Sequence, residues 1–220
     1  MKTRMAINRL ILSVAAALLA AGTWAGPPPD RPLAEVAFVA FDTETTGFGP
    51  SRQRIVELGA VRMERGQIGA GKSWLIDPGI PIPWHASRVH GIEDADVADA
   101  PPFETVYRAF LAFAGDAVLL AHNASFDVGF MRAEMERAGI APEERTVIDS
   151  LQLFRNWFPE APGHSIGELA DYLQIDTGTL HRAETDSELV LRILKRGIEQ
   201  QPAGATLNDL LFAAGKRQSI

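Results

Sequence analysis

One stretch decides the fold and the site of this chain: Val36-Ala37-Phe38-Val39-Ala40-Phe41-Asp42-Thr43-Glu44-Thr45-Thr46-Gly47. A short apolar run that ends at a turn residue is typical of a buried strand. Asp42 and Glu44 lie two residues apart, so on a strand both side chains leave the same face. Neighbouring carboxylates at the end of a buried strand repel each other, and a divalent cation would neutralise them. The alternative is an ordinary strand end that reaches solvent, and the rest of the chain has to decide between the two.

The composition limits the class of protein. The chain has 220 residues, of which 46% are hydrophobic and 22% charged, so it has the composition of one globular domain with a modest extension. The formal net charge of −7 argues against the broad basic surface of a simple nucleic-acid-binding protein. It does not argue against an enzyme that reaches phosphate through bound metal. Because cysteine is absent, disulfides, thiolate zinc sites and cysteine nucleophiles are excluded.

The N-terminal segment differs from the rest of the chain. Lys2, Arg4 and Arg9 precede an uncharged stretch over residues 10–25, which resembles a secretory signal peptide or a membrane anchor. We expect residues 1–25 to direct export or membrane association, and a cytoplasmic location is the alternative if the segment is not a genuine signal.

Three further segments follow the first 25 residues. Residues 26–35 contain three successive prolines and are predicted to form a stiff linker. Residues 36–200 are predicted to form the folded domain. Residues 201–220 are predicted to form a tail with a short helix, and its apolar side chains are expected to pack on the domain.

The pattern of apolar and turn residues predicts strands first and then an alternation of helices and strands. We expect strands at 36–41, 55–64, 68–76, 117–121 and 146–149, and helices at 102–114, 126–138, 150–158, 165–173, 184–199 and 206–214. The prolines at 78, 81 and 83 predict a loop that includes His85 and His90. This order predicts an α/β fold with a mixed β-sheet flanked by α-helices.

Two other carboxylates occur on apolar faces of predicted helices. Asp127 stands in a first helical turn, where an acid favours the helix dipole, but it lies beside an apolar stripe. Asp186 begins the core-facing stripe of the helix at 184–199. A carboxylate on such a face needs a partner or a metal. His181, five residues before Asp186, is a candidate general base because histidine titrates near neutral pH.

Three motifs together resemble the histidine branch of the DEDD family of 3′→5′ exonucleases. They are Phe41-Asp42-Thr43-Glu44-Thr45-Thr46-Gly47, His122-Asn123-Ala124-Ser125-Phe126-Asp127-Val128-Gly129-Phe130 and His181-Arg182-Ala183-Glu184-Thr185-Asp186, in the family's order. Within that family, the motifs resemble those of the proofreading epsilon subunits of bacterial DNA polymerase III. The resemblance covers residues 35–200 and implies a ribonuclease-H-like fold.

The resemblance also implies roles for these residues. Two divalent cations, Mg²⁺ or Mn²⁺, would be held by Asp42, Glu44, Asp127 and Asp186, and His181 would deprotonate the attacking water. Four acids without cysteine suit such hard cations independently of the resemblance. The substrate-binding residues implied by the family are Thr45, Thr46, His122, Asn123 and Phe126. Core packing is an equally good interpretation of Phe126.

The first hypothesis is a metal-dependent exonuclease that acts on single-stranded or frayed 3′ ends of DNA. Two alternatives stay open: an enzyme of the same fold that degrades RNA or short oligonucleotides, and a catalytically silent nucleic-acid-binding module. The sequence does not distinguish the sugar of the substrate, since that depends on a few contacts near the 2′ position. A polymerase partner would suit the family, although we find no polymerase-binding motif, and an exported protein would degrade nucleic acid instead of proofreading.

Overall fold

A computed structural model of the protein describes residues 26–142, 145–178, 181–215 and 217–220. Its centre is one six-stranded sheet in the order β3-β2-β1-β4-β5-β6. The strands are β1 (Phe38–Thr45), β2 (Ile55–Glu64), β3 (Gln67–Leu75), β4 (Val118–Ala121), β5 (Thr146–Asp149) and β6 (Gln218–Ser219). The pairs β1–β4 and β4–β5 are parallel and the other three are antiparallel. The predicted mixed sheet is therefore confirmed.

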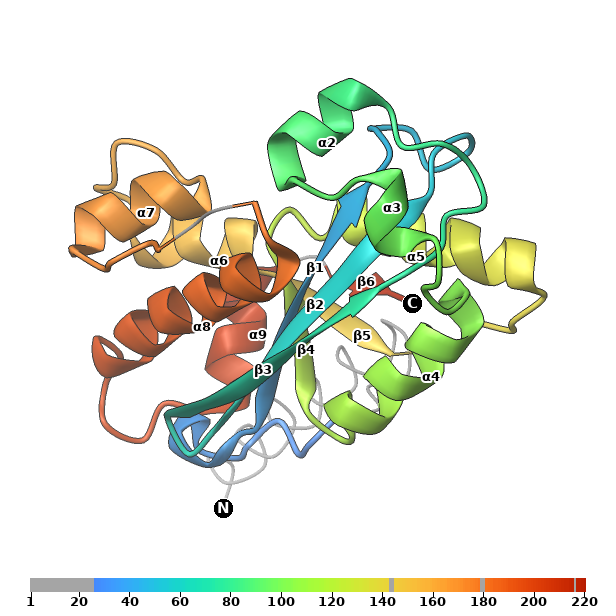
Figure 1. Ribbon diagram of the computed structural model, residues 1–220. Coiled ribbons are helices and arrows are strands. Elements are labelled where there is room, and N and C mark those ends of the chain that lie inside the picture. Colours follow the sequence, from blue (N-terminus) through green and yellow to red (C-terminus); the bar gives the residue numbers. More distant parts are fainter. Residues whose placement is uncertain (1–25, 143–144, 179–180, 216) are drawn as a thin grey trace, which may run out of the picture.

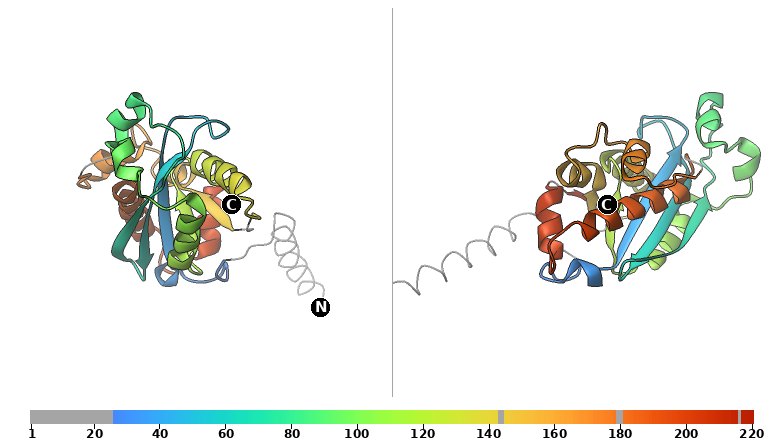
Figure 2. Two further views of the ribbon diagram at one scale, coloured as in Figure 1. Left: turned by 45° about the vertical axis from the view of Figure 1, so that its right-hand side comes forward. Right: turned by 90° about the vertical axis from the view of Figure 1, so that its left-hand side faces the viewer.

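Helices cover both faces of this sheet (Figure 1). One face carries α6 (Ser150–Trp157), α7 (Ile166–Leu173), α8 (Ala183–Glu199) and α9 (Leu207–Ala214). The other face carries α4 (Phe103–Ala114) and α5 (Ser125–Ala138). Figure 2 shows the same layers from two further directions. These elements agree with the helices expected from the apolar periodicity.

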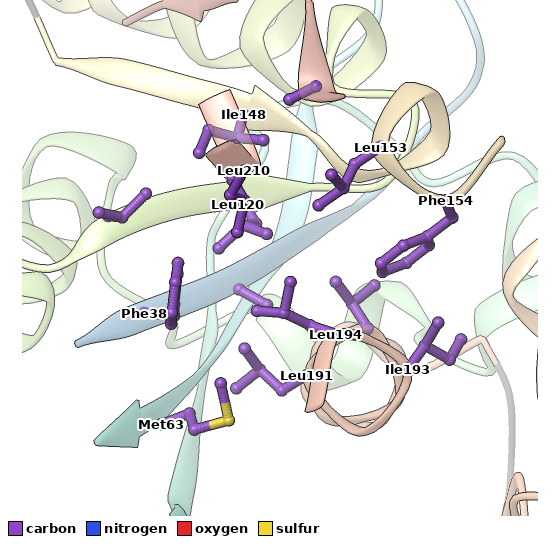
Figure 3. Close-up of a cluster of buried hydrophobic side chains, with 14 of the residues drawn as sticks. Phe38, Met63, Leu120, Ile148, Leu153, Phe154, Leu191, Ile193, Leu194 and Leu210 are labelled. Carbon is purple, nitrogen blue, oxygen red and sulfur yellow. The ribbon is translucent and has the colours of Figure 1, made fainter. Parts of the chain in front are cut away.

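Strand β1 supplies side chains to both layers because its residues alternate between the two faces. Phe38 and Ala40 belong to the core under α8, whereas Val39 and Phe41 belong to the core under α4 and α5. Figure 3 shows Phe38 with Leu191 and Leu194 of α8 in the first of these cores. A strand that is buried on both sides has to be apolar throughout, which explains the continuous apolar run at its start.

The segment predicted as a loop around residues 78–92 is instead partly helical. It contains α2 (Trp84–His90) and is followed by α3 (Asp94–Val97). Pro83 caps the start of α2, and Gly91 ends it in the left-handed conformation at a φ of 75°. A proline before a helix and a glycine after it are both normal boundary signals. The expectation of a loop was wrong for residues 84–90. The three prolines lie before this short helix and do not interrupt it.

Both ends of the described chain pack against the domain. Leu33, in a short 3₁₀ helix (η1, Leu33–Glu35), donates its N–H to the carbonyl of Ala205, and Leu207 donates to the carbonyl of Arg31. Helix α9 buries Leu207, and the C-terminal Ile220 is 1% exposed. The segment predicted as a linker is thus hydrogen-bonded to the start of α9.

The predictions for residues 1–25 lie outside the residues that the structure describes. Within the described part of the chain, every helix is too short or too polar to cross a membrane.

Candidate active site

Three carboxylates meet at the end of β1. Asp42 and Glu44 leave the face of the sheet that α8 covers, and Asp186 comes from the first turn of α8. One oxygen of each of these acids lies within 4.8 Å of the others. Strand β1 and helix α8, which carry these acids, lie side by side (Figure 1). The structure thus brings together acids that are 144 residues apart in the sequence.

Helix α8 reaches this position because two strands present bare glycines to it. Gly59 of β2 lies opposite Asp42, and a Cβ atom there would be 2.2 Å from the backbone of Ala183. Gly71 of β3 leaves room in the same way for the side chain of Glu184. The hydroxyl of Ser187 in α8 lies 3.3 Å from the Gly59 carbonyl and donates to the nearer Ala183 carbonyl at 2.6 Å. The close approach of helix and sheet brings Asp186 to the acids of β1.

Asp127 reaches the site from the opposite layer. Strand β4 pairs with β1 only as far as Ala40, so the β1 backbone beyond it lacks a strand partner on this side. Asp127, at the start of α5, accepts hydrogen bonds from the Thr43 N–H at 3.0 Å and from the Thr43 hydroxyl at 2.8 Å. Both bonds use Oδ1. Asp127 therefore takes the place of a strand partner for the backbone of Thr43. It is not one of the three acids in the group.

The four acids share an unfavourable electrostatic environment. Burial, and then the neighbouring charge of Asp127, raises the pKa of Asp42 well above its ordinary value. Burial and the charge of Asp186 raise the pKa of Glu44 to about 7. Burial also raises the pKa of Asp127 to about 7, against the hydrogen bonds from Thr43, and raises that of Asp186. When several carboxylates lie close together, their mutual repulsion raises their pKa values, and a bound cation would relieve that repulsion.

The group of three acids fits a divalent metal ion. Oδ2 of Asp186 accepts a hydrogen bond from the His181 N–H. Its other carboxylate oxygen, Oδ1, is buried and has no hydrogen-bond partner in the described structure. A buried acceptor without a partner is costly, and a metal ion would satisfy it. The donors are all carboxylate oxygens, which are the ligands that Mg²⁺ and Mn²⁺ prefer.

The predicted general base is hydrogen-bonded to this group through its backbone. His181 is exposed, and its backbone adopts a positive φ of 64° just before α8. The hydrogen bond from its N–H to Asp186 links the two residues directly.

The residues predicted to bind substrate differ in their availability. Thr45 donates its hydroxyl to the Gly47 carbonyl, and the fully buried Thr46 donates its hydroxyl to Gln53. Both ring nitrogens of His122 are bonded within the protein, to the Ser150 hydroxyl and the His164 carbonyl. Burial lowers the pKa of His122 to about 4, so this ring is neutral.

The other two predicted substrate-binding residues keep some accessible surface. Asn123 is exposed, with a positive φ of 61°. Phe126 is partly buried and packs against Phe130, with ring centroids 4.9 Å apart. Asn is one of the residues that adopt this left-handed conformation most readily.

The segment that carries these side chains matches a known protein family. The model of the exonuclease family matches residues 39–194, which include the whole site. The chain belongs to the exonuclease family. The four acids and the histidine that the motifs selected all lie within the matched residues.

The exonuclease is similar to polymerase-associated relatives. Over 167 residues it is 39% identical to a PolC-type DNA polymerase III from Streptococcus pyogenes. The match covers 76% of this chain, but the chain spans only 11% of the length of the polymerase.

Among solved structures, Exonuclease X in complex with 5′-overhanging duplex DNA is 28% identical, with a TM-score of 0.64 over 81% of this chain and 99% of that one. The nuclease domain of 3′hExo, a DEDDh family member bound to rAMP, is 18% identical, with a TM-score of 0.68 over 76% of this chain and 94% of that one. This likeness confirms the ribonuclease-H-like fold.

Proposed function

We propose that this exonuclease removes nucleotides from the 3′ end of DNA, at single-stranded or frayed ends. The observation that carries the proposal is the group formed by Asp42, Glu44 and Asp186, with one buried oxygen free to take a cation. DNA is favoured over RNA because the PolC-type relative is a DNA polymerase and Exonuclease X was solved with DNA.

The roles of the acids follow from their positions. Asp42, Glu44 and Asp186 would hold the metal, and Asp127 would contribute beside Asp42 through its oxygen that Thr43 does not occupy. Two divalent ions, Mg²⁺ or Mn²⁺, would supply an activated water and neutralise charge on the phosphate. His181 would take the proton of the attacking water on a ring nitrogen, because its side chain is exposed and its backbone N–H is hydrogen-bonded to Asp186.

The strand end would be held at the surface beside these acids. The hydroxyls of Thr45 and Thr46 brace the loop after β1, so these residues would shape the site more than donate to the substrate. Asn123 and the exposed edge of Phe126 remain available for a nucleotide. Stacking on an aromatic side chain does not read sequence, which suits an exonuclease.

The experiment is a digestion of a 5′-labelled single-stranded DNA oligonucleotide with Mg²⁺, Mn²⁺ or EDTA. We expect a ladder that shortens from the 3′ end only with metal, and a loss of activity of at least about 100-fold in Asp186→Asn and His181→Ala. Asp171→Asn changes an exposed acid of α7 and is the matched control, with activity unchanged.

Other outcomes would redirect the proposal. Faster digestion of an RNA oligonucleotide of the same sequence would assign the substrate to RNA. A wild-type protein that binds the oligonucleotide but does not shorten it would support a silent binding module.

The biological role depends on residues 1–25. We propose that this segment directs export or anchoring, in which case the enzyme degrades nucleic acid outside the cytoplasm. Mass spectrometry of the mature N-terminus in fractionated cells tests this. Recovery of a chain that begins at Met1 in the cytosol would instead favour replication or repair.

A further inference from the structure

A fifth acid lies beside the site and has no part in the roles above. Glu57 of β2 is fully buried, and it pairs in register with Glu44 of β1. Cross-strand partners leave the same face of a sheet, so Glu57 points toward the start of α8. The sequence gave no reason to select it, because the partner that it binds at the start of α8 lies 126 residues away in the chain.

Glu57 differs from Asp186 in that both of its oxygens are occupied. Oε1 accepts hydrogen bonds from the Ser73 hydroxyl at 2.5 Å and from Arg182 Nη2 at 2.8 Å. Oε2 accepts from Arg182 Nε at 3.3 Å and from the Ala183 N–H at 3.2 Å. Burial acts to raise the pKa of Glu57, but these hydrogen bonds outweigh it and lower the pKa. Glu57 is therefore an ionised group without a free oxygen for a metal.

The partners of Glu57 belong to the segment that carries the proposed base. Arg182 directly follows His181, and Ala183 is the first residue of α8. No side chain of the helix caps this end, so Glu57 provides the acceptor for its first N–H from a neighbouring strand. The positive end of the helix dipole also stabilises an anion at this position. The backbone of His181 is thus held in two ways. Its own N–H bonds to Asp186, and the next residue, Arg182, forms an ion pair with Glu57.

We infer that Glu57 is a positioning residue of the reaction, which fixes His181 beside the acids through Arg182 and Ala183. This inference rests on the proposed role of His181. A displacement of about 1 Å in a catalytic group can cost about 100-fold in rate, so loosening this anchor lowers turnover without removing any group that touches the substrate.

The test compares Glu57→Gln with the wild type in steady-state digestion of the oligonucleotide at saturating Mg²⁺. We expect kcat to fall by about 10- to 100-fold while KM stays within about twofold. Arg182→Gln removes the other half of the pair from an exposed position and is expected to have the same effect. It keeps the inference testable if Glu57→Gln does not fold.

Glu134→Gln is the matched control. Glu134 of α5 is also buried, at 2% exposure, and also binds an arginine, Arg54, and a β2 N–H, that of Ile55. It lies on the opposite face of the sheet from His181. We expect Glu134→Gln to lower stability but to leave kcat within about twofold.

The double variant Glu57→Gln/Arg182→Gln separates positioning from a general structural role. If the two residues act as one unit, the double variant loses no more kcat than the worse single variant. A loss equal to the product of the single losses, or an equal loss in Glu134→Gln, would overturn the inference. If the wild type digests DNA and His181→Ala does not, a normal kcat in both single variants rejects this inference alone. An inactive wild type rejects the proposed function instead.

Discussion

At the scale of single residues, the site combines like charges that the folded protein has to hold together. Glu44 and Asp127 each have a pKa of about 7, and burial is the first cause in both. In the unfolded chain these carboxyls would titrate near pH 4. Between these pH values the folded metal-free protein holds protons that the unfolded chain has lost. Its stability therefore falls as the pH rises through this range.

We expect the metal-free protein to melt a few degrees lower at pH 8 than at pH 5.5, and Mg²⁺ to restore the loss at pH 8. Differential scanning calorimetry with EDTA or with Mg²⁺ measures this. Asp42→Asn removes a repelling charge, so its metal-free Tm at pH 8 should exceed that of the wild type and should not respond to Mg²⁺. A metal-free wild type that is more stable at pH 8 would contradict the assignment.

At the scale of elements, the site depends on how closely α8 lies on the sheet. Asp186 is in the first turn of α8, which rests on the backbone of Gly59. The contact is between backbone atoms, so no side-chain rotation can relieve a clash there. The helix start is also fixed by Glu57, and together these contacts decide where Asp186 and His181 stand.

We expect Gly59→Ala to destabilise the protein by about 1–3 kcal/mol, because a Cβ atom would lie 2.2 Å from the Ala183 backbone. The resulting shift of α8 should also raise the Mg²⁺ concentration needed for half-maximal activity. Thermal unfolding and a Mg²⁺ titration measure the two effects. Gly49→Ala is the control, since nothing lies within 4 Å of a Cβ atom at that position. Equal behaviour of the two variants would show that the close approach is unimportant.

At the scale of the whole molecule, several apolar residues after position 200 are part of the core. Leu207, Leu210 and Leu211 of α9 are buried among the side chains of the α8 layer, and Figure 3 shows Leu210 near Leu120 and Ile148. Residues Thr146 and Val147 of β5 pair with β6 at the edge of the sheet. The family match ends at residue 194, before all of these contacts.

We expect a chain that ends at residue 200 to lose cooperative unfolding. One buried leucine truncated to alanine costs about 2–5 kcal/mol, and total stability is typically about 5–15 kcal/mol. Circular dichroism during heating measures the transition. Phe212→Ser is the control on the same helix, because Phe212 is 89% exposed, and its Tm should stay within about 2 °C of the wild type. A shortened chain with an unchanged transition would show that α9 is dispensable.

The sequence by itself determined the strands and helices with strong periodicity, and its motifs selected Asp42, Glu44, Asp127 and Asp186, with His181, as candidate site residues. It could do so because side-chain alternation, apolar stripes and short motifs are local properties. Only the tertiary structure decided which acids form the tight group, and that Asp127 completes the end of β1. It also added β6 and the hydrogen bonds of Glu57 to Arg182 and Ala183. A pairing between β2 and the start of α8, 125 residues apart, leaves no trace in local pattern, because it depends on which faces meet in space.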